Sequence, residues 1–235
     1  MSRNNDIWLR KPAGLVLGLD FSGGRIDSPT GHSGTLGGNA TVAAGTRYLA
    51  LDGVGDRLDF ADAPEFSFTS GGGVDLPFSF SAWVYLAAHS ALHYLCIKGS
   101  EYQIILGHPG AASKGLTIIL YKPDYSAYIG RRQGANTGIL TGAWFHVATT
   151  YSGSKTAAGI QIFVAGSNVA GTAVGSGVYP GVSNTTAGVT FGWVGFAQDA
   201  SRFADIRLYN RVLASGEISQ IYNAGAARIA QGGTP

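Results

Sequence analysis

The sequence Phe78-Ser-Phe-Ser-Ala-Trp-Val-Tyr85 alternates with a period of two, which is the period of a β-strand. One predicted face of this strand carries Phe78, Phe80, Ala82 and Val84, and the other carries Ser79, Ser81, Trp83 and Tyr85. Because both faces carry aromatic side chains, neither face suits open contact with water. We therefore expect this strand in the middle of a packed sandwich, with its second face covered as well.

Similar short runs recur along the chain, separated by clusters of Gly, Pro, Asn, Asp and Ser that are typical of turns. The predicted strands are Leu15–Phe21, Tyr48–Leu51, Arg57–Phe60, Phe78–Leu86, Tyr94–Ile97, Tyr102–Leu106, Leu116–Tyr121, Tyr125–Ile129, Trp144–Tyr151, Ile160–Ala165, Val189–Phe191 and Ala204–Tyr209. The pattern predicts an all-β chain folded as an antiparallel two-sheet sandwich.

The composition excludes several classes of protein. The chain has 235 residues, of which 36 are Gly, with 13% charged side chains and a net charge of +2. Such low charge together with 11 Phe, 11 Tyr and 4 Trp excludes a coiled coil and a disordered chain. No basic run is longer than Arg131-Arg132, so we expect no nucleic-acid partner. Cys96 is the single cysteine and cannot form a disulfide within the chain.

One segment has the periodicity of a helix, Ser215–Asn223, where Ile218, Ile221 and Tyr222 form an apolar stripe. Ser215 is the predicted N-cap. We expect three parts in the chain: an N-terminal arm at residues 1–12 that includes Trp8 and Arg10, one domain at residues 13–223, and a small polar tail at residues 224–235.

The N-terminus has no apolar stretch of the kind that signal peptides contain, and no run approaches about 18 apolar residues. We therefore expect synthesis in the cytoplasm without secretion, and no membrane association.

Four strings stand in the order and spacing of one known family. They are Ala50-Leu-Asp-Gly-Val-Gly-Asp-Arg-Leu-Asp-Phe60, Phe80-Ser-Ala-Trp-Val84, Trp144-Phe-His-Val-Ala-Thr-Thr-Tyr151 and Ala204-Asp-Ile-Arg-Leu-Tyr-Asn-Arg-Val-Leu213. From about Leu15 to Asn223 the chain resembles the laminin-G-like, concanavalin A-like jelly rolls. The resemblance implies two curved antiparallel sheets, the concave one commonly used for glycans or protein partners. It does not by itself give a function.

Asp52 and Asp56 lie in a segment rich in carboxylates and Gly. Hard cations such as Ca²⁺ prefer several oxygen ligands, and related jelly rolls often bind calcium, so a calcium site here is one alternative. The other is a structural turn in which each Asp bonds its own backbone.

Catalysis needs groups that the sequence does not bring together. The glucanases of this fold place their acids on one strand as Glu-x-Asp-x-(x)-Glu, whereas Glu65, Glu101 and Glu217 lie on separate segments here. The His89-x-x-x-His93 spacing suits metal binding only on a helix, which is not predicted there, and His146 is predicted to be a sheet residue bonded to the backbone. We therefore predict a protein that is not an enzyme, although a glycoside hydrolase with a displaced acid pair stays open.

Aromatic residues beside turns provide the remaining functional signal. Sugar rings stack on aromatic faces while Asp and Arg bond their hydroxyls, and partner or oligomer interfaces use the same residue types. The predicted glycan or partner site consists of Tyr121, Asp124, Tyr125, Tyr128, Arg131, Tyr179 and Trp193.

These features lead us to expect a binding or assembly module on a bacteriophage virion, as a capsid decoration or tail-associated protein. In this hypothesis the arm with Trp8 and Arg10 docks on a capsid or tail protein, and the lectin-like face binds cell-surface glycan. A free carbohydrate-binding protein is the first alternative, and formation of a homo-oligomer is left open.

Overall fold

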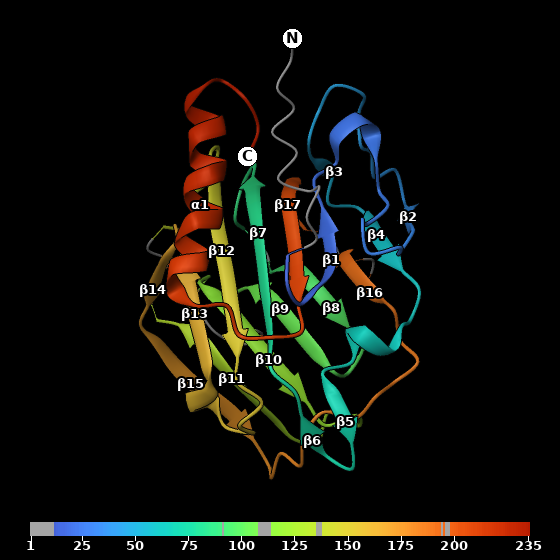
Figure 1. Ribbon diagram of the computed structural model, residues 1–235, viewed down its shortest axis with the longest axis vertical. Helices are drawn as coiled ribbons and strands as arrows, with labels where there is room; N and C mark the ends of the chain where they lie inside the picture. The colour runs from blue at the N-terminus through green and yellow to red at the C-terminus, as the bar shows by residue number, and fades with distance from the viewer. Residues whose placement is uncertain (1–11, 91, 108–113, 135–137, 194, 196–197) are drawn as a thin grey trace.

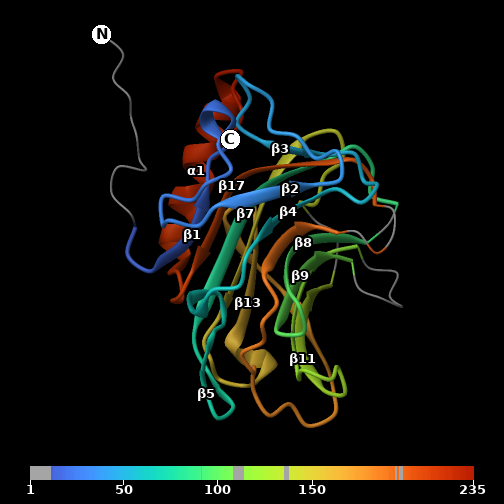
Figure 2. The ribbon, with the colours of Figure 1, turned by 90° about the vertical axis from the view of Figure 1, so that its right-hand side faces the viewer.

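The computed structural model describes residues 12–90, 92–107, 114–134, 138–193, 195 and 198–235. Two antiparallel sheets pack face to face, and one helix, α1 (Ser215–Ala230), lies on the outer side of the first sheet (Figure 1, Figure 2). The order of layers is therefore helix, sheet, sheet. The predicted all-β sandwich with one C-terminal helix is confirmed.

The first sheet has seven strands and the second has eight. The seven-stranded sheet runs β1 (Leu15–Leu19), β17 (Ser201–Tyr209), β7 (Phe78–Leu86), β12 (Trp144–Tyr151), β13 (Ile160–Val164) and β14 (Ser167–Val169), and β3 (Leu49–Leu51) also pairs with β17. The eight-stranded sheet runs β15 (Gly171–Ser176), β11 (Tyr128–Gln133), β10 (Leu116–Tyr121), β9 (Tyr102–Leu106), β8 (His93–Lys98), β16 (Val189–Gly192), β4 (Arg57–Phe60) and β2 (Gly34–Gly37). A small hairpin joins β5 (Thr69–Gly71) to β6 (Val74–Asp75).

Strand β7 occupies the central position that its sequence predicts, between β17 and β12. Phe78, Phe80, Ala82 and Val84 point into the main core between the sheets and are fully buried. The opposite face of β7 is covered on the helix side, because the ring of Trp83 stacks on Tyr222 of α1 and the Ser79 hydroxyl donates to the Arg211 carbonyl. The expectation that both faces are covered is confirmed.

Helix α1 packs through the predicted stripe. Ile218 and Ile221 lie in a second, smaller core with Phe163 and Leu213, and the Ser219 hydroxyl donates to the Gly166 carbonyl. Within the part of the chain that the structure describes, no helix is long and apolar enough to span a membrane.

The predicted end and cap of the helix are wrong. The helix continues to Ala230, into the segment that we expected to be a tail. Gly225 lies against the Trp83 indole, where a Cβ atom would be 2.2 Å from Nε1, so packing holds a residue of low helix propensity inside the helix. Ala214, not Ser215, occupies the N-cap position, and the Glu217 carboxylate accepts the Ala214 N–H at 2.8 Å.

The strand predictions fail mainly at the edges of the sheets. Strands β2, β14 and β15 lack apolar alternation because most of their side chains are exposed or only partly buried. The prediction of a strand at Tyr125–Ile129 is wrong at its start, since β11 begins at Tyr128 and residues 122–127 form a turn closed by the Lys122 N–H donating to the Ala127 carbonyl. Residues 1–11 of the expected arm lie outside the described residues.

Candidate functional site: an aromatic face on the eight-stranded sheet

The hairpin of β10 and β11 carries three tyrosines on the outer face of the eight-stranded sheet. Tyr121 and Tyr128 are direct cross-strand partners with ring centroids 5.7 Å apart, and the Tyr125 ring lies 5.0 Å from that of Tyr121. Cross-strand aromatic pairs support each other's orientation on a sheet. The hairpin therefore brings together three of the predicted residues.

A rigid turn presents Tyr125 at the tip of this hairpin. Asp124 accepts a hydrogen bond from the Lys122 ammonium at 2.8 Å and from the N–H and hydroxyl of Ser126 at 2.9 and 2.6 Å. These hydrogen bonds, that of Lys122 first, hold the pKa of Asp124 well below its ordinary value. Tyr125 has a φ of 59° and is 53% exposed, so the carboxylate fixes a turn that holds an aromatic ring in solvent.

A second aromatic pair continues the same face. Tyr94 of β8 stacks on Trp193 at 5.1 Å, and both pack with Tyr121 and Tyr128 over Ile97, Ile105 and Ile119. Burial, followed by the proximity of Tyr94, Tyr125 and Tyr128, raises the pKa of Tyr121, so its hydroxyl is neutral near pH 7 and donates to the Gln103 side chain at 3.4 Å. We call Tyr94, Tyr121, Tyr125, Tyr128 and Trp193 the tyrosine face.

Two predicted residues lie elsewhere. Arg131 is on the opposite side of β11 from Tyr128 and donates to the carbonyls of Ala157 and Ile160 at 3.3 and 3.4 Å. The Tyr179 hydroxyl donates to the buried Asp75 carboxylate at 3.0 Å, beside Tyr151. Both side chains thus make hydrogen bonds within the fold, and neither lies on the tyrosine face. Trp8 and Arg10 fall outside the described residues.

Tyr94 and Arg132 also lie on this side of the sheet and were not among the predicted site residues. Tyr94 stands in an apolar run that is typical of a buried strand, but a bulge between Tyr94 and Cys96 turns its ring to the outer face. Arg132 shares a face with Tyr128 because the two are four residues apart on β11. The period of two, counted from Tyr128, would have favoured Arg132 over Arg131.

Asp52 and Asp56 form the network that the turn alternative describes. Asp56 is buried and accepts the backbone N–H groups of Asn39 and Asp52 at 2.7 and 2.6 Å. Asp52 accepts the Asn39 side-chain amide and the Val54 N–H, and these hydrogen bonds, that of Asn39 first, lower its pKa. Among the described residues, no group of three or more His, Cys, Asp and Glu side chains is arranged to hold a metal ion.

The three glutamates lie in separate environments. Glu101 is fully buried beside Lys98, Glu65 contacts His32 at 3.0 Å, and Glu217 pairs with Arg211. Each of the three carboxylates thus contacts a different basic side chain. None of these contacts joins two of the glutamates.

The histidines occupy different structural roles. His93 begins β8 and contacts Asp199 at 3.1 Å, and its ring lies 5.3 Å from that of His89, which is in the preceding loop rather than on a helix. His146 is a sheet residue, as predicted, but its ring nitrogen Nε2 bonds the Ser81 hydroxyl at 2.9 Å instead of the backbone. Burial lowers the pKa of His146 to about 4.

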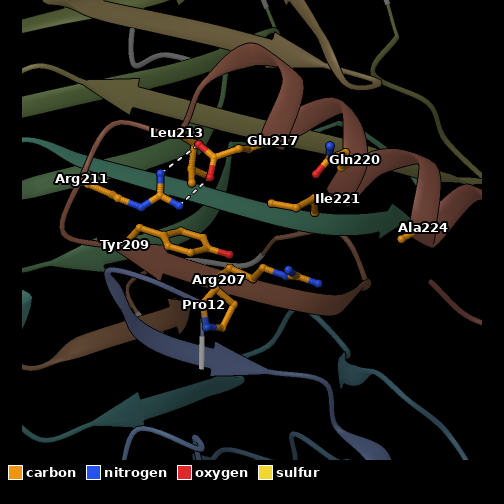
Figure 3. Close-up of a pocket in the computed structure, with 9 residues that line it drawn as sticks. All are labelled: Pro12, Arg207, Tyr209, Arg211, Leu213, Glu217, Gln220, Ile221 and Ala224. Carbon is orange, nitrogen blue, oxygen red and sulfur yellow. Dashed lines mark hydrogen bonds and ion pairs between the residues drawn. The ribbon is translucent and has the colours of Figure 1, made fainter. Parts of the chain in front are cut away.

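A cavity of about 290 Å³ lies on the helix side of the molecule, between β17 and the first turns of α1 (Figure 3). Its walls include Pro12, Tyr209, Leu213 and Ile221, and Figure 3 shows Arg211 directed at the Glu217 carboxylate. The Arg211 and Glu217 side chains form two hydrogen bonds of 2.8 and 2.6 Å, so the charges at this end of the cavity neutralise each other. The tyrosine face, on the other sheet, is the better candidate for recognition.

Comparisons with known proteins agree with this fold. A family model described as the concanavalin A-like lectin/glucanases superfamily, Laminin_G_3, matches residues 52–219. No curated protein matches the sequence.

Several solved structures have a similar fold. The receptor-binding domain of botulinum neurotoxin C/D mosaic serotype matches with a TM-score of 0.68 and 12% identity over 92% of this chain and 52% of that chain. The serotype D ligand-binding domain in complex with N-acetylneuraminic acid matches with a TM-score of 0.63 and 12% identity, over 92% and 52%. A structure of botulinum neurotoxin type C, a toxin whose cell entry depends on interaction with two ganglioside molecules, matches with a TM-score of 0.64 and 14% identity. This match covers 90% of this chain and 51% of that chain. This chain spans about half the length of each of these proteins, and identities this low show the fold alone.

Proposed function

Since the chain belongs to the Laminin_G_3 family of the concanavalin A-like lectin/glucanase superfamily, we propose that it is a non-enzymatic binding module that recognises glycan through the tyrosine face. The family contains both lectins and glucanases, so the choice between binding and hydrolysis has to rest on the side chains. In this chain the aromatic groups converge on one face and the glutamates do not converge.

The observation that carries this proposal is the exposure of Tyr125 beside the packed rings of Tyr121 and Tyr128. Stacking of a sugar ring on an aromatic side chain that is already held in place costs little side-chain entropy of the protein. Tyr125 is held by the Asp124 turn, and the neutral Tyr121 hydroxyl beside it donates to Gln103 and keeps its lone pairs for a ligand donor. Toxin domains of similar fold give further support for a glycan ligand, since one is in complex with N-acetylneuraminic acid and the cell entry of another toxin depends on interaction with gangliosides.

The contacts of the glutamates favour binding over hydrolysis. A glycosidase needs two carboxyl groups on either side of one bond, about 5–9.5 Å apart. Glu101 is fully buried. Glu217 accepts hydrogen bonds from the Arg211 guanidinium and from the backbone N–H of Ala214 at the start of α1. Both carboxylates thus have structural roles that would be lost if they served as acid and base.

Replacing Tyr125 by alanine is expected to weaken glycan binding about tenfold, because an aromatic contact contributes up to about 1.5 kcal/mol. Screening the protein on a glycan array, with calcium and with EDTA, identifies the ligand, and calorimetry then measures the affinity of both proteins. Tyr48→Ala is the matched control, because Tyr48 precedes β3 of the other sheet and packs on Trp144.

Two results would contradict this role for Tyr125. One is an unchanged affinity in the Tyr125→Ala variant. The other is that the wild-type protein binds no glycan, while the mass of the Tyr125→Ala variant in solution, measured by sedimentation, differs from that of the wild type. The second result would favour the alternative in which this face is an interface between copies of the chain or with a partner protein.

As a finer assignment, we propose that the module is displayed on a bacteriophage virion. A domain of low charge and high aromatic content supports this proposal, because it suits packing on a large particle while one face stays available for cell-surface glycan. Mass spectrometry of virions from a phage that encodes the chain should find it in the particle, and deletion of residues 1–12 should release it. If the protein remains attached after that deletion, the docking role of Trp8 and Arg10 is wrong.

A further inference from the structure

We infer that Arg132 makes the tyrosine face selective for acidic saccharides, that is, glycans that carry a carboxylate or sulfate group. This inference rests on the proposed glycan-binding function and specifies its ligand class. Its basis is a partly buried cation that lies on the same face as the tyrosines and that finds no partner among the described residues.

The strand register places Arg132 on the tyrosine face. Residues 128, 130 and 132 of β11 point to one side of the sheet, and Arg132 lies opposite Thr117 of β10 and Thr172 of β15. Thr117 in turn lies opposite Ile105, which packs beneath the rings. Tyr128 and Arg132 are about 13 Å apart along the strand, a length that suits a short oligosaccharide.

Arg132 differs from nearly all other described arginines in having no partner. The side chain is partly buried and its Nε is enclosed, yet the described part of the chain offers that atom no hydrogen-bond acceptor. The other arginines with partners are Arg47 with Asp20, Arg57 with Asp59, Arg131 with two carbonyls, Arg202 with two tyrosine rings, Arg207 and Arg228 with Asp205, and Arg211 with Glu217. Arg25 is exposed to water and needs none.

An enclosed guanidinium Nε without an acceptor is unfavourable, because that atom has lost water without gaining a hydrogen bond. The cross-strand neighbours Thr117 and Thr172 are neutral and bring no compensating charge. The carboxylate of Asp124, on the same hairpin, is already occupied by Lys122 and Ser126. An anionic group on a bound ligand would supply the missing acceptor in the planar, two-point geometry that guanidinium groups favour.

The ligand therefore has two parts in this arrangement. A sugar ring stacks near Tyr125 and Tyr128, and an acidic substituent on it or on the next sugar reaches Arg132. A carboxylate and a sulfate share this chemistry, so sialylated, uronic and sulfated oligosaccharides are separate arms of one test.

The test compares acidic oligosaccharides with their neutral parents on a glycan array, followed by calorimetry at physiological salt. The wild-type protein is expected to bind acidic members at least tenfold more tightly than their neutral parents. Arg132→Gln should lose about tenfold or more in affinity for the acidic ligand and retain the affinity for the neutral parent. Arg25→Gln changes the net charge equally and should behave as the wild type.

Each outcome has a distinct meaning. If Arg132→Gln keeps the preference for acidic glycans, or if the wild type binds neutral and acidic members equally, the inference is wrong and the glycan-binding function stands. If the wild type binds no glycan at all, the proposed function fails as well. Retained binding of the neutral parent shows that the variant is folded, and Arg132→Lys shows whether charge alone suffices or the guanidinium is required.

Discussion

Replacement of Lys98 by methionine is expected to lower the free energy of unfolding by about 3–5 kcal/mol, measured by urea denaturation. Lys98 and Glu101 are both fully buried, and the Lys98 ammonium lies 2.6 Å from Asp62 and 3.1 Å from Glu101 and donates to the Ala187 carbonyl. Removing the cation leaves the Glu101 carboxylate enclosed without a compensating charge. The loss therefore reflects an unpaired buried ion more than the lost contacts themselves.

A double variant separates these causes. Lys98→Met combined with Glu101→Gln removes both charges, while the amide oxygen of the new glutamine can still accept from Thr185 and Ser67, as the Glu101 carboxylate does. We expect the double variant to be more stable than Lys98→Met alone. Lys122→Met is the matched control: it breaks the exposed pair with Asp124 and should cost less than about 1 kcal/mol. Equal losses in Lys98→Met and Lys122→Met would contradict the argument.

Acidification from pH 7 to pH 5 is expected to remove about 2 kcal/mol of stability through His146 alone. Burial lowers the pKa of His146 from 6.5 to about 4, opposed by Asp205 and assisted by Arg207. Between these two values the unfolded chain binds a proton that the folded chain does not. The contribution of His146 to the free energy of unfolding is therefore fully present above about pH 6.5 and declines as the pH falls toward 4.

His89 and His93 contribute to the same decline, because burial also lowers their pKa values. The variant His146→Gln isolates one residue, since glutamine keeps a polar group near Ser81 without titrating. Denaturation curves at several pH values should show a shallower loss for His146→Gln than for the wild type, by about 2 kcal/mol at pH 5. Parallel losses in the two proteins would show that His146 is not protonated on unfolding.

The central strands of this fold were predictable from the sequence because the alternation of their residues reflects which side chains are buried in the core. Strands β7 and β12 were predicted with nearly the bounds that they have, since inward and outward positions alternate without interruption. Edge strands such as β15 were not, because a strand that faces water on most sides has no apolar period to detect. The last turns of α1 were not predicted because Gly225 has a low helix propensity. Its place in the helix depends on contact with Trp83, which is distant in the sequence.

The tyrosine face was partly predictable for a related reason. Tyr121, Tyr125 and Tyr128 surround a turn, so their proximity follows from local sequence. Tyr94 joins them only through a bulge, which shifts the faces of β8 by one residue and has no clear mark in the sequence. Tyr179 was misplaced because its bond to Asp75 joins residues 104 positions apart.

The outer sides of the two sheets differ, and this difference affects how strongly several copies of the protein could bind a sugar-covered surface. Helix α1 packs on the outer side of the seven-stranded sheet, whereas the tyrosine face lies on the outer side of the eight-stranded sheet. One shallow contact with a sugar is weak, whereas many copies held in a common orientation engage a sugar-covered surface together and gain avidity without any new contact. If the module is displayed on a particle, as proposed, attachment through the helix-covered side would leave the tyrosine face turned outward.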